Sequence, residues 1–172
     1  EHMFFEEERL PIVQEMILAE TDGLREKCLN QLLPIQQKDF EGVFRAMDGF
    51  PVIIRLIDPP LHEFLPSYDE LFEKYIILKE TKSDNQKIAE CGKMLQAVRS
   101  MRESNPMLGL RGVRLGIIWP SINAMQVKAI FKAACKVKKN GINVKPEIMI
   151  PLVSTSKELA RLQALLEKEA KI

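Results

Sequence analysis

Two arginines are the residues of this sequence that are best suited to bind an anion. Arg55 lies inside the apolar run PVIIRLI at residues 51–57. A guanidinium buried in such a strand lowers stability by several kcal/mol unless an anion pairs with it. The partner of Arg55 is either a carboxylate, such as that of Asp58 or one from another element, or a bound ligand. A planar guanidinium can grip the oxygens of a phosphate or carboxylate ligand at two points.

Arg111 carries a weaker signal of the same kind. It follows Gly109 where a loop is expected to open a short helix, so backbone amides and the side chain could converge on an anion. A surface arginine without a ligand is the alternative interpretation. Arg114, about one turn further on, is interpreted as structural, and His62 as a loop histidine without an acid-base role.

The sequence contains no complete catalytic constellation. There is no Ser-His-Asp arrangement, no Walker-type phosphate loop and no HExxH motif, and no pair of carboxylates has an obvious metal-binding spacing. Cys28, Cys91 and Cys135 are widely separated and odd in number, which is typical of reduced thiols rather than of disulfides or a metal site. We therefore expect no catalytic residue and no metal ligand within the chain.

The composition is that of an ordinary globular protein. Hydrophobic residues make up 46% and charged residues 28%, with a net charge of +1. This balance gives no electrostatic reason to expect nucleic acid or a membrane surface as a partner. No apolar run approaches the roughly 18 residues of a transmembrane helix, and the start does not resemble a signal peptide. We expect a cytoplasmic location, or one inside a plastid or another organelle.

Periodic apolar positions predict several helices and two strands. Helices are expected at 6–20, from Asp22 to Pro34, at 37–47, 68–79 and 84–102, near Arg111, from a cap at Ser121 to 139, and after a capping box formed by Thr155 and Glu158. Residues 83–85, Ser-Asp-Asn, are expected to form the turn and the cap between the helices at 68–79 and 84–102. Strands are expected at 51–57 and 147–153, each buried on both faces. The basic residues 136–139 are interpreted as complementing the dipole of their helix.

This order predicts an α/β fold, because strands separated by helical crossovers form βα units of a parallel sheet. Two strands cannot complete a closed barrel, which needs eight. We therefore predict a helix-rich, partial (β/α)8 TIM-type barrel spanning 1–172, with about two βα units and a helical insertion at about 67–104. Uncovered strand edges favour a homodimer or segment exchange, which light scattering would detect.

Four segments resemble the PEP/pyruvate-binding barrel of pyruvate, phosphate dikinases, enzymes that use phosphoenolpyruvate (PEP). They are EHMFFEEER at 1–9, VIIRLIDPPLHEFLP at 52–66, NPMLGLRGVRLGI at 105–117 and EIMIPLV at 147–153. The resemblance implies an enzyme that converts ATP, pyruvate and phosphate into AMP, PEP and pyrophosphate. It also implies that Arg55 and Arg111 hold the phosphoryl group, which a phosphohistidine domain of the same protein exchanges with this barrel.

The same resemblance implies that important parts of the active site lie elsewhere. The first barrel arginine of the family precedes the position of Glu1, and the Mg2+ ligands and proton-donating cysteine follow residue 172. ATP binds another domain, so we expect residues 1–172 alone to be inactive. Two other functions remain open, namely a non-enzymatic helical interaction module and a phosphotransferase like Enzyme I of the bacterial sugar system. The DPPLHEFLP segment at 58–66 argues against the latter.

Overall fold

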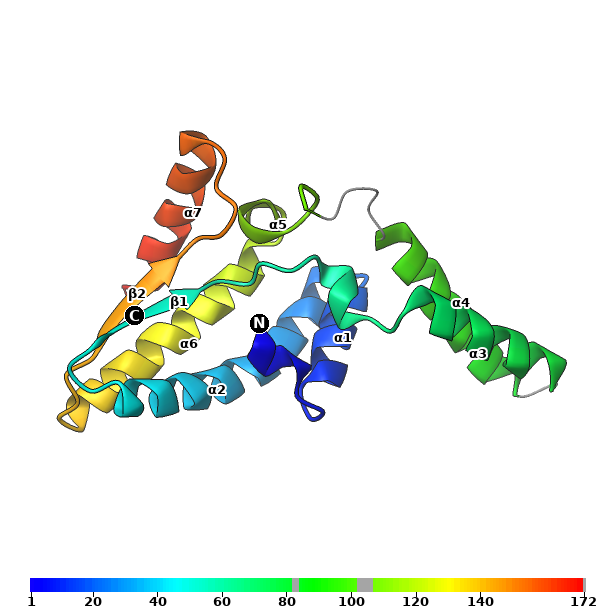
Figure 1. The fold of residues 1–172 in the computed structure, drawn as a ribbon, viewed down its shortest axis with the longest axis horizontal. Coiled ribbons are helices and arrows are strands. Elements are labelled where there is room, and N and C mark those ends of the chain that lie inside the picture. Colours follow the sequence, from blue (N-terminus) through cyan, green and yellow to red (C-terminus); the bar gives the residue numbers. More distant parts are fainter. Residues whose placement is uncertain (82–83, 102–106, 172) are drawn as a thin grey trace. The chain divides into compact units, whose positions relative to one another are not determined.

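The computed structural model describes residues 1–81, 84–101 and 107–171. The described residues form seven α-helices and two short strands, as expected for a helix-rich α/β chain (Figure 1). The chain divides into two compact units. Unit 1 comprises Glu1–Pro59 and Leu110–Ile172, and unit 2 comprises Pro60–Gly109. No helix in the described ranges is long and apolar enough to cross a membrane.

A pair of parallel strands forms the sheet of unit 1, which confirms the predicted parallel arrangement. β1 (Pro51–Arg55) pairs with β2 (Lys145–Met149), with Arg55 opposite Met149. β2 begins two residues earlier and ends earlier than predicted. Its end has a local cause, because Pro151 cannot donate to a ladder and Leu152 takes a positive φ of 57° that turns the chain.

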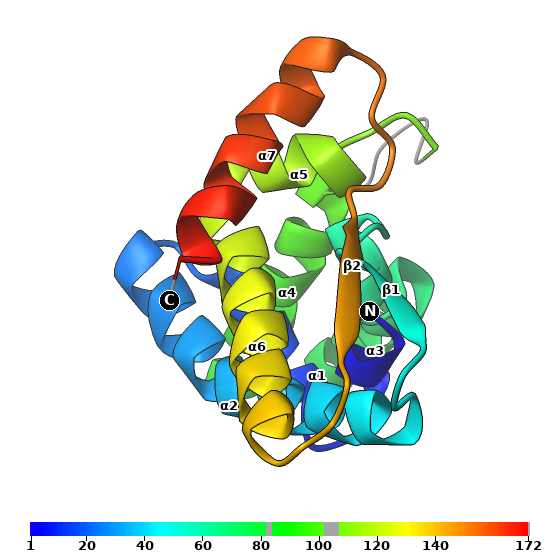
Figure 2. The same ribbon diagram turned by 90° about the vertical axis from the view of Figure 1, so that its left-hand side faces the viewer.

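The prediction that both faces of each strand are buried is wrong for this chain. Helices lie on one side of the two strands, and Figure 2 shows α6 alongside them on that side. Val52 and Ile54 are partly buried, whereas Ile53 is 60% and Met149 46% exposed on the other face. Arg55 alternates with Ile54 and lies on this open face, so its side chain is half exposed rather than buried in the strand.

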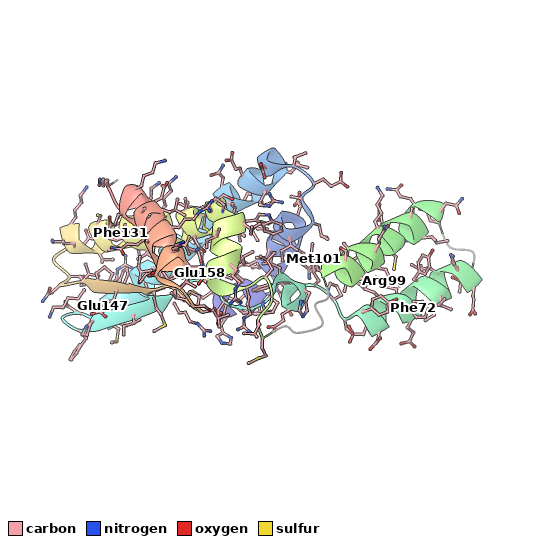
Figure 3. The ribbon with its side chains drawn as sticks, turned by 90° about the horizontal axis from the view of Figure 1, so that it is seen from above. Phe72, Arg99, Met101, Phe131, Glu147 and Glu158 are labelled. Atoms are coloured by element: carbon pink, nitrogen blue, oxygen red, sulfur yellow. The ribbon has the colours of Figure 1, made fainter. Side chains whose placement is uncertain are left out.

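Two long helices supply the core beneath the strands. α2 (Asp22–Ala46) and α6 (Pro120–Lys139) pack against each other along their lengths (Figure 1). The core residues that they and the start of the loop after β1 contribute are Phe40, Phe44, Leu56, Val127, Ala129, Ile130, Ala133, Ala134 and Val137. Figure 3 shows Phe131 of α6 on the helix side of unit 1 and Glu147 of β2 on the strand side.

The predicted break at Pro34 does not occur, and α2 runs through it as one helix. Pro34 cannot donate a hydrogen bond to Asn30, but both residues lie on the exposed face, where water can satisfy the carbonyl. Packing of the opposite, buried face of α2 outweighs the free-energy cost of the missing hydrogen bond. The cap also differs from the prediction, because Thr21 rather than Asp22 accepts the amide hydrogen bond of Leu24.

The remaining helices of unit 1 follow the predicted pattern with shifted ends. A 3-10 turn, η1 (His2–Phe5), precedes α1 (Leu10–Leu18), which is shorter than the predicted 6–20. α5 (Gly112–Ile118) is the short helix expected near Arg111. Ser121 does not cap α6, because Pro120 already occupies the first helical position, where its missing N–H is harmless.

The last helix, α7 (Ser156–Glu169), has the predicted capping box. Thr155 Oγ1 accepts from the Glu158 amide at 3.3 Å, and Glu158 Oε2 accepts from the Thr155 amide at 2.9 Å. The backbone amides of Ser154 and, next in size of effect, Thr155 donate to the Glu158 carboxylate and lower its pKa, because they stabilise the ionised form. α6 ends in the expected basic turn before Gly141, whose φ is 88°.

A buried carboxylate joins α2 to α6. Glu41 is buried and accepts from Lys136 at 2.9 Å, from Arg45 at 3.1 Å and from Gln37 at 3.0 Å. The hydrogen bond from Lys136 is the largest cause that lowers the pKa of Glu41, although burial opposes it. The ionised carboxylate therefore stabilises the contact between the two helices.

Glu41→Gln is expected to weaken the α2–α6 contact at neutral pH. Because the pKa of Glu41 is lowered in the folded protein, the ionised side chain stabilises the fold fully above about pH 5. This stabilisation is lost as pH falls through the folded pKa. Amide protection in α2 and α6 of the full-length protein should fall about tenfold at pH 7, and by less as pH approaches 4. Hydrogen exchange corrected for intrinsic rates measures this. Glu26→Gln, at an exposed site on α2, is the control. If the loss of amide protection in Glu41→Gln were the same at every pH, the prediction would be contradicted.

Unit 2 is a helical hairpin, as predicted. After η2 (Leu61–Phe64), α3 (Tyr68–Glu80) and α4 (Asn85–Met101) pack side by side, and Figure 3 labels Phe72 and Arg99 on them. Asp84 Oδ1 accepts from the amide of Gln86 at 3.0 Å, which makes Asp84 the predicted cap. Ser83 of the predicted turn and residue 102 lie outside the described residues.

Candidate functional site

The first arginine lies at the carboxyl end of β1. Arg55 NH1 is 3.1 Å from Asp58 Oδ2, and its NH2 donates to the carboxylate of Glu1. The carboxylate partner that the sequence suggested for Arg55 is therefore present, together with a second carboxylate from the start of the chain. These partners hold the guanidinium at the strand end, where it lies 46% exposed.

The second arginine binds the same aspartate. Arg111 Nε donates to the backbone oxygen of Asp58 at 3.1 Å, and its NH2 donates to Asp58 Oδ2 at 3.0 Å. Its side chain is only 18% exposed, so Arg111 is more buried than an ordinary surface arginine. Because Arg55 and Arg111 contact one oxygen atom, their two guanidinium groups lie next to each other.

Three chain segments meet at this point. The Gly112 amide donates to the Asp58 carbonyl at 3.2 Å, and the Val113 amide donates to the Pro151 carbonyl at 2.9 Å. Gly112 has a φ of 54°, and a Cβ there would lie 3.0 Å from the Pro151 oxygen and 3.1 Å from Asp58 Oδ1. The close approach of the loops after β1 and β2 to the start of α5 thus depends on a glycine at 112.

A buried amide side chain fixes the segment between the strand and Asp58. Gln126 of α6 is 2% exposed, and its Oε1 accepts from the Ile57 amide at 3.0 Å. The Leu56 amide donates to the carbonyl of Met149 at 3.0 Å, which continues the pairing of the two strands. The backbone amides of the two residues before Asp58 are therefore both hydrogen-bonded.

The site balances two cations with two buried carboxylates. Asp58 is 7% exposed, and its Oδ1 has no hydrogen-bond partner within the described residues. The Glu1 side chain is 8% exposed. A ligand with a phosphate or carboxylate group could compete with these carboxylates for the donors of Arg55 and Arg111.

An open pocket of about 350 Å3 lies beside Arg55. Its lining includes Glu1 and Met3 of the N-terminal turn, Gln36 and Phe40 of α2, and Ile53 and Arg55 of β1. The lining is mainly apolar with a guanidinium at its edge. Such a pocket suits a small organic anion better than a large polar ligand.

Two further residues were considered from the sequence, Arg114 and His62. Arg114 donates to Ser154 Oγ at 3.2 Å and lies 4.0 Å from a carboxylate oxygen of Glu158, in keeping with its structural interpretation. His62 is in η2 of unit 2 and is partly exposed. Across residues 1–81, 84–101 and 107–171, no group of three or more His, Cys, Asp or Glu side chains could hold a metal ion.

The three cysteines are free thiols, as expected. Cys28 and Cys91 are buried and Cys135 is exposed. Burial raises the pKa of Cys28 because it disfavours the thiolate. Sequence reasoning missed Glu1 as a partner of Arg55, and it gave Asp58 only as one candidate for Arg55 and not as a partner of Arg111. Such long-range pairs leave no signal in local spacing.

Comparison with known families adds what the geometry leaves open. The family model "PEP-utilising enzyme, PEP-binding domain" matches residues 1–172. The chain belongs to this family. The resemblance noted in the four sequence segments is therefore confirmed at the level of the family. Residues 105 and 106 of the third segment lie outside the described residues.

Individual relatives carry a more specific name. The chain is 48% identical to pyruvate, phosphate dikinase of Giardia intestinalis over 170 residues and 47% identical to chloroplastic pyruvate, phosphate dikinase 1 of Arabidopsis thaliana over 171 residues. It is 49% identical to pyruvate, phosphate dikinase 2 of Zea mays over 173 residues. Each match covers 99% of this chain but only 17–19% of the relative. The chain thus spans less than a fifth of the length of these relatives.

Proposed function

We propose that this chain is the PEP-binding part of a pyruvate, phosphate dikinase and that Arg55 and Arg111 hold the phosphoryl group. The observation that carries the proposal is the contact of both guanidinium groups with one oxygen of Asp58, at the carboxyl end of β1. Parallel α/β enzymes place their chemistry at this end of the strands. Family membership makes PEP the anion that such a pair would bind.

Two adjacent guanidinium groups suit the reaction of such an enzyme. The full-length protein would make PEP, AMP and pyrophosphate from pyruvate, ATP and phosphate, with a phosphohistidine domain carrying the phosphoryl group to this site. Phosphoryl transfer is accelerated mainly by positioning the reactants and stabilising charge on the equatorial oxygens. Arg55 and Arg111 would supply both effects through charged N–H donors.

The open face of the two strands supports a place within a larger barrel. Ile53 and Met149 expose apolar side chains on the face that also carries Arg55. In a (β/α)8 barrel this face would line the interior, where layers of side chains from other strands would cover it. We include this partial barrel, the insertion at about 67–104 and a homodimeric assembly in the proposal.

The Mg2+ that the family implies does not fit the residues described in this chain. The aspartate and glutamate of the arginine site are engaged with Arg55 and Arg111, and the part of the chain that the structure describes holds no metal-binding cluster. We derive no step through this ion. Its ligands and the catalytic cysteine are proposed to lie outside residues 1–172. The chloroplastic relatives support a plastid as one possible location.

PEP binding to the full-length protein tests the proposal. Arg55→Ala should weaken PEP affinity about 10- to 100-fold, because charged hydrogen bonds to the phosphate are lost. Titration calorimetry measures the affinity. Arg161→Ala, at an exposed arginine of α7, should change it less than twofold. An unchanged affinity in Arg55→Ala would reject the phosphate-binding role and favour the helical interaction module.

A further inference from the structure

We propose that a second pocket of unit 1, between α2 and α6, binds a small phosphate monoester that carries an apolar group. The pocket has a volume of about 550 Å3, which falls within the usual range for small-molecule sites. Its lining is mainly cationic and apolar and consists of Gln37, Phe131, Lys132, Cys135, Lys136 and Lys139. The site is separate from the arginine pair, so the inference does not rest on the proposed function.

Cationic and apolar side chains of α6 line this pocket side by side. Lys132, Lys136 and Lys139 are spaced by four and three residues, and Phe131 and Cys135 by four, so each set follows one line along the helix. Phe131 is partly buried against the core on the helix side of unit 1 (Figure 3), and Cys135 is exposed. The ammonium groups suit an anion, and the phenyl ring suits an apolar group of the same ligand.

The dipole of α6 accounts for only part of this positive charge. Lys136 and Lys139 lie in the last turn of the helix, where cations complement the dipole. Lys132 lies about two turns before the end of α6, and the dipole effect is confined to the last turn. Like charges four residues apart also repel each other, so Lys132 and Lys136 disfavour the helix when no anion lies between them.

Glu41 neutralises one of the three lysines. Its carboxylate accepts from Lys136 at 2.9 Å and from the side-chain amide of Gln37 at 3.0 Å, which holds both groups in place. Lys132 and Lys139 form no ion pair within residues 1–81, 84–101 and 107–171. Two ammonium groups of the pocket therefore remain available to a ligand.

The charge and size of the pocket favour a phosphate monoester over other anions. Such a group carries about −1.5 to −2 charges at pH 7, which matches two ammonium groups, whereas a carboxylate carries one. Lysine binds phosphate as a point charge with three donors and needs no fixed two-point geometry. A concave site of this volume holds a small molecule rather than a segment of another protein.

Alkylation of Cys135 in the full-length protein reports on the pocket directly, because this exposed thiol is part of the lining. Phenyl phosphate is the probe, iodoacetamide is the neutral reagent, and peptide mass spectrometry identifies the alkylated cysteine. At ten times its dissociation constant, phenyl phosphate leaves about a tenth of the pockets open, so alkylation of Cys135 should slow about tenfold. Phenol and inorganic phosphate at the same concentration should slow it less than about twofold, because each offers only half of the contacts.

Substitution of the two available lysines tests the electrostatic part of the proposal. Lys132→Gln and Lys139→Gln should each raise the dissociation constant of phenyl phosphate about three- to fivefold, because each removes one exposed charged contact. The double variant should raise it about tenfold or more. Lys157→Gln, at an exposed lysine of α7, is the charge-matched control and should change it less than about twofold.

Three results would overturn the proposal. The first is equal protection of Cys135 by phenyl phosphate in the double variant and in the unmodified protein. The second is protection by phenol or by inorganic phosphate that equals the protection by phenyl phosphate. The third is a Cys135 that resists alkylation without any ligand, which would mean that another part of the full-length protein covers the pocket. None of these results bears on Arg55, whose role is tested by the titration with PEP.

Discussion

Replacing Arg111 by alanine in the full-length enzyme is expected to lower the rate of PEP formation from pyruvate about a thousandfold. Single donors that stabilise charge in a transition state contribute about 100- to 1,000-fold, and arginines in phosphoryl transfer contribute up to about 100,000-fold. Arg111 is 18% exposed and held by Asp58 through Nε and NH2, so little reorganisation would precede the proposed contact with the phosphoryl group. Steady-state turnover with saturating pyruvate measures the loss.

Lysine should not restore the function at this position. An ammonium group offers a point charge and cannot make the two contacts with the backbone oxygen and carboxylate of Asp58. We therefore expect Arg111→Lys to lie closer to Arg111→Ala than to the unmodified enzyme. Arg161→Ala should retain turnover within twofold. Full activity of Arg111→Lys would show that only charge, and not the oriented guanidinium, is needed.

Gly116→Ala is expected to have the largest effect on stability, at about 3 kcal/mol or more. Gly116 is buried in α5, and a Cβ there would collide with the side-chain amide of Asn123 and lie 3.0 Å from Leu162 Cδ1. Asn123 of α6 and Leu162 of α7 are each 1% exposed, so neither has room to withdraw. The three helices must separate for the methyl group to fit.

Hydrogen exchange of α5, α6 and α7 in the full-length protein measures this effect as lost protection of their amides. The same substitution at Gly42 is the matched control. Gly42 lies within α2, away from both helix ends and on the solvent-exposed face, and a Cβ there would meet nothing within 4 Å. Gly42→Ala should therefore be neutral or stabilise by up to about 1 kcal/mol, because alanine favours a helix. Equal protection in the two variants would contradict the steric argument.

Local chemistry in the sequence was sufficient where a structure depends on neighbours along the chain. The capping box of Thr155 and Glu158, the cap of α4 at Asp84 and the basic end of α6 all form from residues within one or two turns. Crossover helices between apolar runs were enough to predict parallel strands. The predictions at the helix ends hold because each of those interactions is between residues close in sequence.

Predictions made from local sequence were wrong where packing between distant segments outweighs local preferences. Pro34 has the usual effect of a helix breaker, yet α2 continues because the opposite face of the helix packs on the core. The strands look fully buried from their apolar residues, but helices cover only one face of them in this chain. A pattern of apolar residues predicts which side chains will be buried. It does not predict which segments of the chain will pack against them.

From the sequence alone, Arg55 could be predicted to need an anionic partner and Arg111 to lie at the start of a short helix. Tertiary structure decided that both arginines meet at one oxygen of Asp58, because the loop after β1, the loop after β2 and the start of α5 converge there. The contact between Arg111 and Asp58 joins residues that are 53 positions apart in the chain. Spacing along a sequence cannot encode such a meeting, which arises only when these three segments pack together.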